Sequence, residues 1–146
     1  MRFVNDNVMH SVYGAAATIA LLAVVAGCGS SRPDGLPETA IVEGVVKLNG
    51  APLNEGVVRF VPEDTTCNPG VGMINPDGTF ELSTYERLDG ATVGKHKVVV
   101  HVEPHLDGSS PDPPVQTPRK YHDIATTPLE VEIKSGETNE VVLDIK

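Results

Sequence analysis

From residue 40 to the end of the chain, apolar and polar side chains alternate with a period of two, which is typical of strands that bury one face. In the first such segment Val42, Val46 and Leu48 fall on one face, while Glu43 and Lys47 fall on the other. The same alternation recurs in six later segments, and no helical period of 3.6 residues competes with it. These segments lie near 58–60, 71–75, 79–83, 95–103, 129–134 and 140–145. The pattern predicts an all-β protein with seven strands.

Turn residues separate these segments and predict how the strands connect. Asn49-Gly50 and Pro76-Asp77-Gly78 are typical of tight turns, and Ser135-Gly136 turns the chain before the last segment. We therefore expect two hairpins, one joining 71–75 to 79–83 and the other joining 129–134 to 140–145. Seven short strands with one apolar face each are buried most economically in two facing sheets, so the predicted fold is a seven-stranded antiparallel β-sandwich.

The N-terminal segment has the pattern of an export signal. Residues 14–27 carry no charged side chain, which suits a signal peptide and is short for a transmembrane helix of about 20 residues. The run ends in Val25-Ala26-Gly27-Cys28, which resembles the lipobox of bacterial lipoproteins. The resemblance implies cleavage before Cys28, with residues 1–27 removed, and lipidation of the Cys28 thiol. Two or more acyl chains would hold the protein firmly on a membrane.

Two other interpretations of this segment stay open. One is an ordinary signal peptide with a chance cysteine. The other is an uncleaved anchor helix, because the apolar stretch can be extended back to Val8. Residues 28–39 are rich in Gly, Ser and Pro and predict a flexible tether between the lipidated cysteine and a domain at 40–146. Gly29 stands where an Asp often retains lipoproteins at the inner membrane, so the outer membrane is favoured.

Composition and charge narrow the set of partners. The formal net charge is −9, and removing 1–27 takes away one base, Arg2, and one acid, Asp6, so the charge is unchanged. No basic stripe is present, which argues against nucleic acid and against electrostatic docking to anionic lipids. The 146 residues include no Trp, so the core must be mainly Val, Ile and Leu. Cys28 and Cys67 are too few to define a disulfide framework.

Several of these segments resemble carboxypeptidase regulatory-like domains. The similar segments are 44–53 with 56–60 at the opening, 77–82 in a central hairpin, and 94–98 at a later strand start, with His96 where an aromatic residue is usual. The resemblance implies a transthyretin-like, prealbumin-type sandwich of seven strands. Residues 118–123 and 126–131 also resemble short planctomycete lipoproteins that combine a lipobox with one such domain. The resemblance to these lipoproteins supports the predicted fold and the predicted location on a membrane, but it implies little about mechanism.

Candidate catalytic and metal-binding residues are sparse. His96, His101, His105 and His122 lack the spacing of a metal site, and regular strand geometry places His96 and His101 on opposite faces, so we predict no metal and no cofactor. Exposed or half-buried imidazoles are the simpler interpretation. Ser109, Ser110 and the loop thiol of Cys67 have no partner that the sequence can place. One transthyretin-like enzyme hydrolyses 5-hydroxyisourate and ends in Tyr-Arg-Gly-Ser, whereas this chain ends in Leu143-Asp144-Ile145-Lys146.

Tyr121-His122-Asp123 is the cluster most like a ligand or partner surface. It follows a Pro-rich loop at 106–118, and its rings could stack on a sugar or on a partner side chain. The structural alternative, which we favour, is that Tyr121 closes the end of the sandwich and Asp123 caps a turn. The sequence thus predicts a non-enzymatic, membrane-anchored binding or structural module with a protein or glycan partner in the envelope. A carbohydrate-binding accessory protein that uses Tyr121 is the alternative, and an unrecognised hydrolase is a third.

Overall fold

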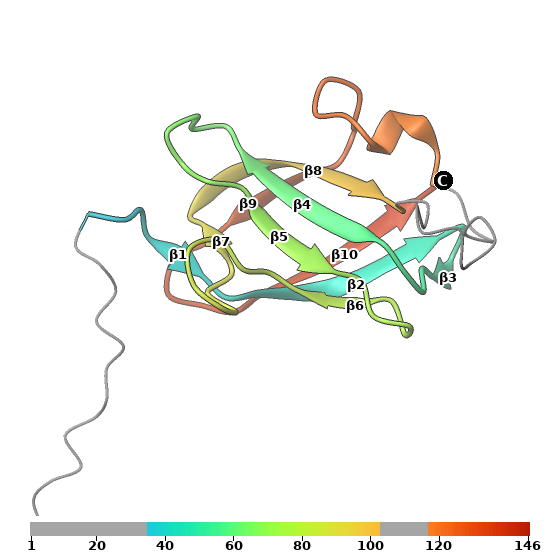
Figure 1. Ribbon diagram of the computed structural model, residues 1–146, viewed down its shortest axis with the longest axis horizontal. Coiled ribbons are helices and arrows are strands. Elements are labelled where there is room, and N and C mark those ends of the chain that lie inside the picture. The colour runs from blue at the N-terminus through green and yellow to red at the C-terminus, as the bar shows by residue number, and fades with distance from the viewer. Residues whose placement is uncertain (1–34, 103–116) are drawn as a thin grey trace, which may run out of the picture. The chain divides into compact units, whose positions relative to one another are not determined.

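In the described residues, 35–102 and 117–146 of this computed structural model, the regular secondary structure consists almost entirely of β-strands (Figure 1). They contain ten strand segments and one 3-10 helix, which confirms the prediction of an all-β protein. The elements are β1 (Thr39–Ala40), β2 (Val42–Leu48), β3 (Ala51–Pro52), β4 (Val57–Pro62), β5 (Gly70–Met73), β6 (Thr79–Glu81), β7 (Ala91–Thr92), β8 (Gly94–His101), η1 (Arg119–Tyr121), β9 (Glu130–Ile133) and β10 (Asn139–Ile145). The predicted signal peptide, Cys28 and loop residues 106–116 lie outside the described residues.

The seven predicted segments correspond to the longer strands β2, β4, β5, β6, β8, β9 and β10. Three strands of two residues each, β1, β3 and β7, add to them, so the strand count differs from the prediction. β3 forms the turn expected after β2, because Leu48 pairs with Ala51 across Asn49-Gly50. Both turn residues have positive φ, 52° and 85°, the conformation that a two-residue hairpin of this type requires.

The strands form two four-stranded sheets and one small two-stranded sheet. In the first sheet β2 is central, with β10 on one side and β3 and β6 pairing along its length. In the second sheet the order is β5-β4-β8-β9, and β1 pairs with β7 in the small sheet. The first sheet is not antiparallel throughout, because β10 runs parallel to β2 over seven residue pairs.

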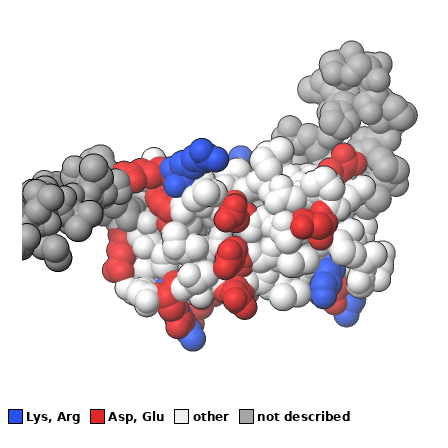
Figure 2. All heavy atoms as spheres, turned by 90° about the horizontal axis from the view of Figure 1, so that it is seen from below, with Lys and Arg blue, Asp and Glu red and all other residues white. Residues whose placement is uncertain are grey.

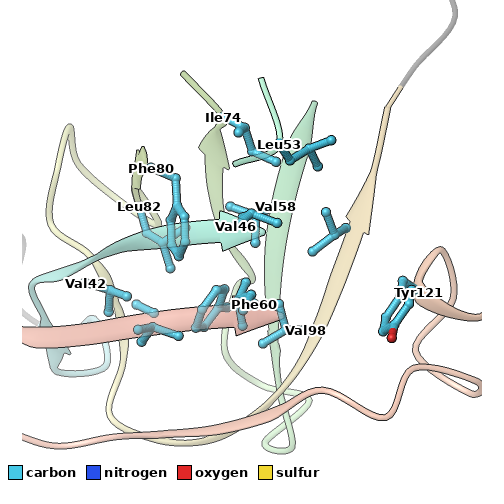
Figure 3. Close-up of a cluster of buried hydrophobic side chains, with 14 of the residues drawn as sticks. Val42, Val46, Leu53, Val58, Phe60, Ile74, Phe80, Leu82, Val98 and Tyr121 are labelled. Carbon is cyan, nitrogen blue, oxygen red and sulfur yellow. The ribbon is translucent and has the colours of Figure 1, made fainter. Parts of the chain in front are cut away.

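Side chains from both large sheets meet in one hydrophobic core (Figure 3). Val42 and Val46 of β2 and Val58 and Phe60 of β4 are at most 1% exposed, as their alternation predicted. The rings of Phe60 in one sheet and Phe80 in the other lie 6.0 Å apart in a tilted arrangement. That arrangement is one of the favourable geometries for an aromatic pair. The core thus joins the two sheets through a few large rings set among Val, Leu and Ile.

The predicted hairpin between 129–134 and 140–145 is wrong. β9 pairs with β8 in the second sheet, whereas β10 pairs with β2 in the first. The Asn139 side chain explains the change of sheet, because its Oδ1 accepts the Lys134 N–H at 2.9 Å and its Nδ2 donates to the Lys134 carbonyl at 3.1 Å. The Asn139 N–H then donates to the Ile41 carbonyl at 2.8 Å, which starts the pairing with β2.

The predicted hairpin between 71–75 and 79–83 is correct at its turn and incomplete along its arms. The Gly78 N–H donates to the Asn75 carbonyl at 2.8 Å, which closes the tight turn. Beyond the turn, β5 joins the second sheet and β6 joins the first, and Val71 and Ser83 form an isolated bridge between the arms. The turn at Pro76-Asp77-Gly78 therefore connects a strand of the second sheet to a strand of the first.

Gly44 tests the close packing within the first sheet. A Cβ added there would lie 2.8 Å from Cζ of Phe80 and would also clash with the Val141 carbonyl oxygen. Gly→Ala lowers the conformational entropy of the unfolded chain, which stabilises the folded state by about 0.4–1 kcal/mol. Overpacking against a backbone oxygen costs more, about 1–3 kcal/mol or above. We expect Gly44→Ala to lower the free energy of unfolding in urea by more than Val45→Ala, whose side chain is half-buried on the other face. If Gly44→Ala had the same urea midpoint of unfolding as the wild type, that result would contradict this close packing.

Candidate functional site

The predicted cluster at Tyr121-His122-Asp123 lies at and just after η1, beside the end of β10. Tyr121 is 3% exposed, and Figure 3 shows it at one end of the core cluster. Its hydroxyl accepts the Lys146 N–H at 3.0 Å and donates to the Lys146 carbonyl at 3.2 Å. The ring thus anchors the last residue of the chain. The Lys120 ammonium, 4.9 Å from the ring centroid, makes a cation–π contact with it.

Asp123 caps the turn that follows. Its Oδ1 accepts the Ala125 N–H at 2.8 Å, and its carbonyl accepts the N–H groups of Thr126 and Thr127. Both features match the structural interpretation of the cluster, in which Tyr121 packs and Asp123 stabilises a turn. With its ring buried, Tyr121 presents no face for a sugar, so this part of the glycan interpretation is not supported.

His122 is exposed and is brought close to a second imidazole. Its ring centroid lies 6.1 Å from that of His101 in β8, and its Nε2 lies 2.7 Å from the Thr117 hydroxyl. Sequence reasoning did not pair His101 with His122, because the approach depends on how the chain returns after a long loop. A hydroxyl beside an imidazole has the outline of a nucleophile with its base. Thr117 is only 5% exposed, however, so its hydroxyl is shielded from a substrate.

His96 has a different environment from the one that the sequence predicted. Its side chain is 1% exposed, not exposed or half-buried, and its ring lies 6.1 Å from that of Phe60. Nε2 is 3.2 Å from the Thr92 hydroxyl, and Nδ1 is 3.0 Å from the Gly94 carbonyl. Burial lowers the pKa of His96, because the charged imidazolium loses its hydration, although the Gly94 carbonyl partly opposes this shift. His96 is therefore a neutral core residue.

Within the described ranges, no three His, Cys, Asp or Glu side chains are arranged to hold a metal ion. Cys67 is a free, half-buried thiol whose backbone N–H donates to the Asp64 carbonyl. Asp64 stabilises the same loop, and its pKa is lowered by hydrogen bonds from Thr66. His105, Ser109 and Ser110 lie outside the described residues, as does Cys28.

An open hollow of about 340 Å³ lies over β2, β6 and β10, and sequence analysis did not identify it. We call it the outer-face trough. Its borders are two rows of side chains that cross the three strands. One row is Glu140, Glu43 and Glu81, and the other is Val142, Val45 and Thr79. The alternation predicts that these side chains face outward. Their alignment across the strands depends on the parallel register of β10 with β2, which no local sequence pattern predicts.

A second hollow of about 450 Å³ lies beside β1, between Thr39–Ile41 and residues 136–138. One of its carboxylates, Glu137, already lies 3.8 Å from the Lys134 ammonium. The outer-face trough is therefore the better candidate for binding, because its glutamates form no ion pair with any residue in the described ranges.

Comparison of the chain with protein-family models, with curated proteins and with solved structures finds no match. The likeness to carboxypeptidase regulatory-like domains therefore rests on the residue patterns alone. In the part of the chain that the structure describes, no helix is long and apolar enough to cross a membrane.

Replacing Tyr121 tests its structural role. Tyr121→Phe removes the hydroxyl that pairs with Lys146, and a buried hydrogen bond of this kind contributes about 0.5–1.5 kcal/mol. We expect a loss of about 1 kcal/mol in urea unfolding. Tyr85→Phe is the matched control, since its hydroxyl accepts the exposed Asn68 N–H, which water can satisfy, and it should lose less. Equal stability of Tyr121→Phe and the wild type would argue against this anchoring role.

The buried imidazole of His96 predicts a pH dependence of stability. Because burial lowers its pKa in the folded state, the unfolded chain binds more protons below the ordinary value of 6.5. The contribution of neutral His96 is present above pH 6.5 and is lost as the pH falls through the folded-state pKa. We expect urea unfolding to show this loss as the pH falls below 6.5, with a smaller slope in His96→Gln.

His122→Gln is the control for this measurement, because it removes an exposed imidazole and leaves the buried His96 in place. If His96→Gln and the wild type lost stability in parallel, His96 would not be the group responsible.

Proposed function

We propose that the chain is a bacterial lipoprotein whose residues 40–146 form a non-catalytic β-sandwich of transthyretin-like type, acting as a binding or structural module at the cell envelope. The anchor is argued from Val25-Ala26-Gly27-Cys28 at the end of an apolar run. β1 begins at Thr39, so only a short tether separates Cys28 from the β-structure. The observation that carries the proposal is this succession of a lipidation motif, a tether and one all-β unit.

A binding role is favoured over an enzymatic one by the surroundings of the hydroxyl groups. The hydroxyl–imidazole pairs Thr92–His96 and Thr117–His122 both bury their threonine, which is 1% and 5% exposed respectively. A nucleophile must be reachable by its substrate. The outer-face trough, in contrast, is open to solvent and is lined by exposed side chains. A protein partner in the envelope fits this surface better than a glycan held by the buried Tyr121.

The location follows from the residue after the lipidated cysteine. Gly29 replaces the Asp that often retains lipoproteins at the inner membrane, so the outer membrane is the proposed location. The net charge of −9 means that attachment would depend on the acyl chains and not on attraction to anionic headgroups. The planctomycete-type lipoproteins that the tail resembles have the same arrangement of lipobox and domain.

Metabolic labelling with a radioactive fatty acid in a bacterial host tests the anchor. The wild-type chain should take up label and fractionate with membranes at the mature mass, because the Cys28 thiol is the acceptor. Cys28→Ala should be unlabelled and unprocessed. Cys67→Ala is the matched control and should be labelled like the wild type. Membrane-bound Cys28→Ala at the mature mass would refute the lipoprotein assignment.

A further inference from the structure

The pairing of β2 with its two neighbours aligns three carboxylates on the outer face of the first sheet. Glu43 lies directly opposite Glu140 of β10 and directly opposite Glu81 of β6. All three side chains are exposed. Directly opposed positions place Cβ atoms about 4.5–5.5 Å apart, and like charges in such positions destabilise the sheet. Figure 2 looks onto the molecule from the side of β2 and β6, and it shows acidic side chains on this surface with basic ones toward its margins.

The described residues supply no countercharge to this row. Glu43, Glu81 and Glu140 take part in none of the ion pairs of the described residues. Lys47 lies two positions beyond Val45 and is opposite Asp144, whose carboxylate also holds the Lys146 ammonium at 3.0 Å. The basic residues beside this sheet, Lys47 and Lys146, thus lie near Asp144 and not near the glutamate row.

A second row, displaced by two residues from the glutamates on each strand, is mainly apolar. Val142 is opposite Val45, and Val45 is opposite Thr79. Val142 is 66% exposed on this outer face. The outer-face trough of about 340 Å³ lies between the rows, with the Val141, Gly44 and Phe80 positions between them. One border is therefore anionic and the other is mainly apolar.

We propose that the outer-face trough docks a segment of a partner protein that presents Lys or Arg side chains. The aliphatic stem of such a side chain would pack along Val142 and Val45, while its cationic head would meet the glutamate row. Long basic side chains commonly divide their contacts in this way. This inference rests on the proposed binding role and names the chemistry of the partner.

Charge selects this occupant over the alternatives. A second copy of the chain would bring the same glutamate row and a net charge of −9 to the contact. A nucleic acid would be repelled for the same reason. The three glutamates form a line across the strands, and no metal-holding group is found among the described residues. A cationic segment alone relieves the repulsion within the row and covers the exposed valine.

A peptide titration of the full chain tests the proposal. The probe is an acetylated, amidated heptapeptide of alternating Lys and Val, added to the ¹⁵N-labelled protein in a non-ionic detergent. We expect saturable amide shifts confined to β2, β6 and β10, with an affinity that falls as salt is added. A peptide of alternating Glu and Val should produce no shifts. Lipid attachment is not needed for this result, so it is distinguishable from failure of the Cys28 prediction.

Two matched triple variants separate a site from general attraction. Glu43→Gln/Glu81→Gln/Glu140→Gln should weaken peptide binding at least tenfold. Glu63→Gln/Glu86→Gln/Glu132→Gln makes the same change in net charge at exposed positions elsewhere and should stay within twofold of the wild type. Val142→Thr should also weaken binding, because it removes apolar contact from the second border. The first triple variant should melt at or above the wild-type temperature, since repulsion is removed.

Three outcomes would overturn the proposal. Equal losses in both triple variants would show attraction to an acidic protein without a site. Shifts centred on other strands would place the peptide elsewhere. Saturation of the same amides by calcium chloride, with loss of peptide binding, would show that the row holds a metal ion instead.

Discussion

The contact between Phe60 and Phe80 is the interaction on which the two-sheet arrangement depends. Their rings, 6.0 Å apart, come from different sheets, in a chain with only three phenylalanines and no tryptophan. Most of the other core residues are smaller Val, Leu, Ile and Ala side chains, with Tyr121 at one end of the cluster. Phe80 reaches this position because Gly44, opposite it on β2, has no side chain.

The sequence predicted the faces of the strands correctly but not all of their neighbours. Alternation is a local property, so it identified Val58 and Phe60 as inward and Arg59 as outward, as the structure has them. Pairing depends on contacts between distant segments. The parallel alignment of β10 with β2 joins residues almost a hundred positions apart, and the side chain of Asn139 directs the chain between sheets. Turn residues predict that the chain reverses, but not which sheet it enters next.

The candidate site shows the same division between local and distant information. The turn role of Asp123 and the packing role of Tyr121 could be predicted, because both depend on nearby residues and on a common way of closing a β-domain. The approach of His122 to His101 could not, since it requires the tertiary path of the chain. The burial of His96 could have been predicted, because alternation along β8 places it on the same face as the inward Val98 and Val100. The outer-face trough was also beyond reach, because its two rows exist only in the register of three strands.

The register that builds the core does not by itself require the glutamate row. Packing aligns Val141, Gly44 and Phe80 across the three strands, and their preceding or following neighbours must then align on the outer face. Alignment alone places no demand on which residues stand there, because outward positions of a sheet tolerate many polar side chains. Alternating charges would stabilise the sheet, whereas three like charges destabilise it. The fold thus carries a local electrostatic cost that its own packing does not explain, and a cationic partner offsets such a cost.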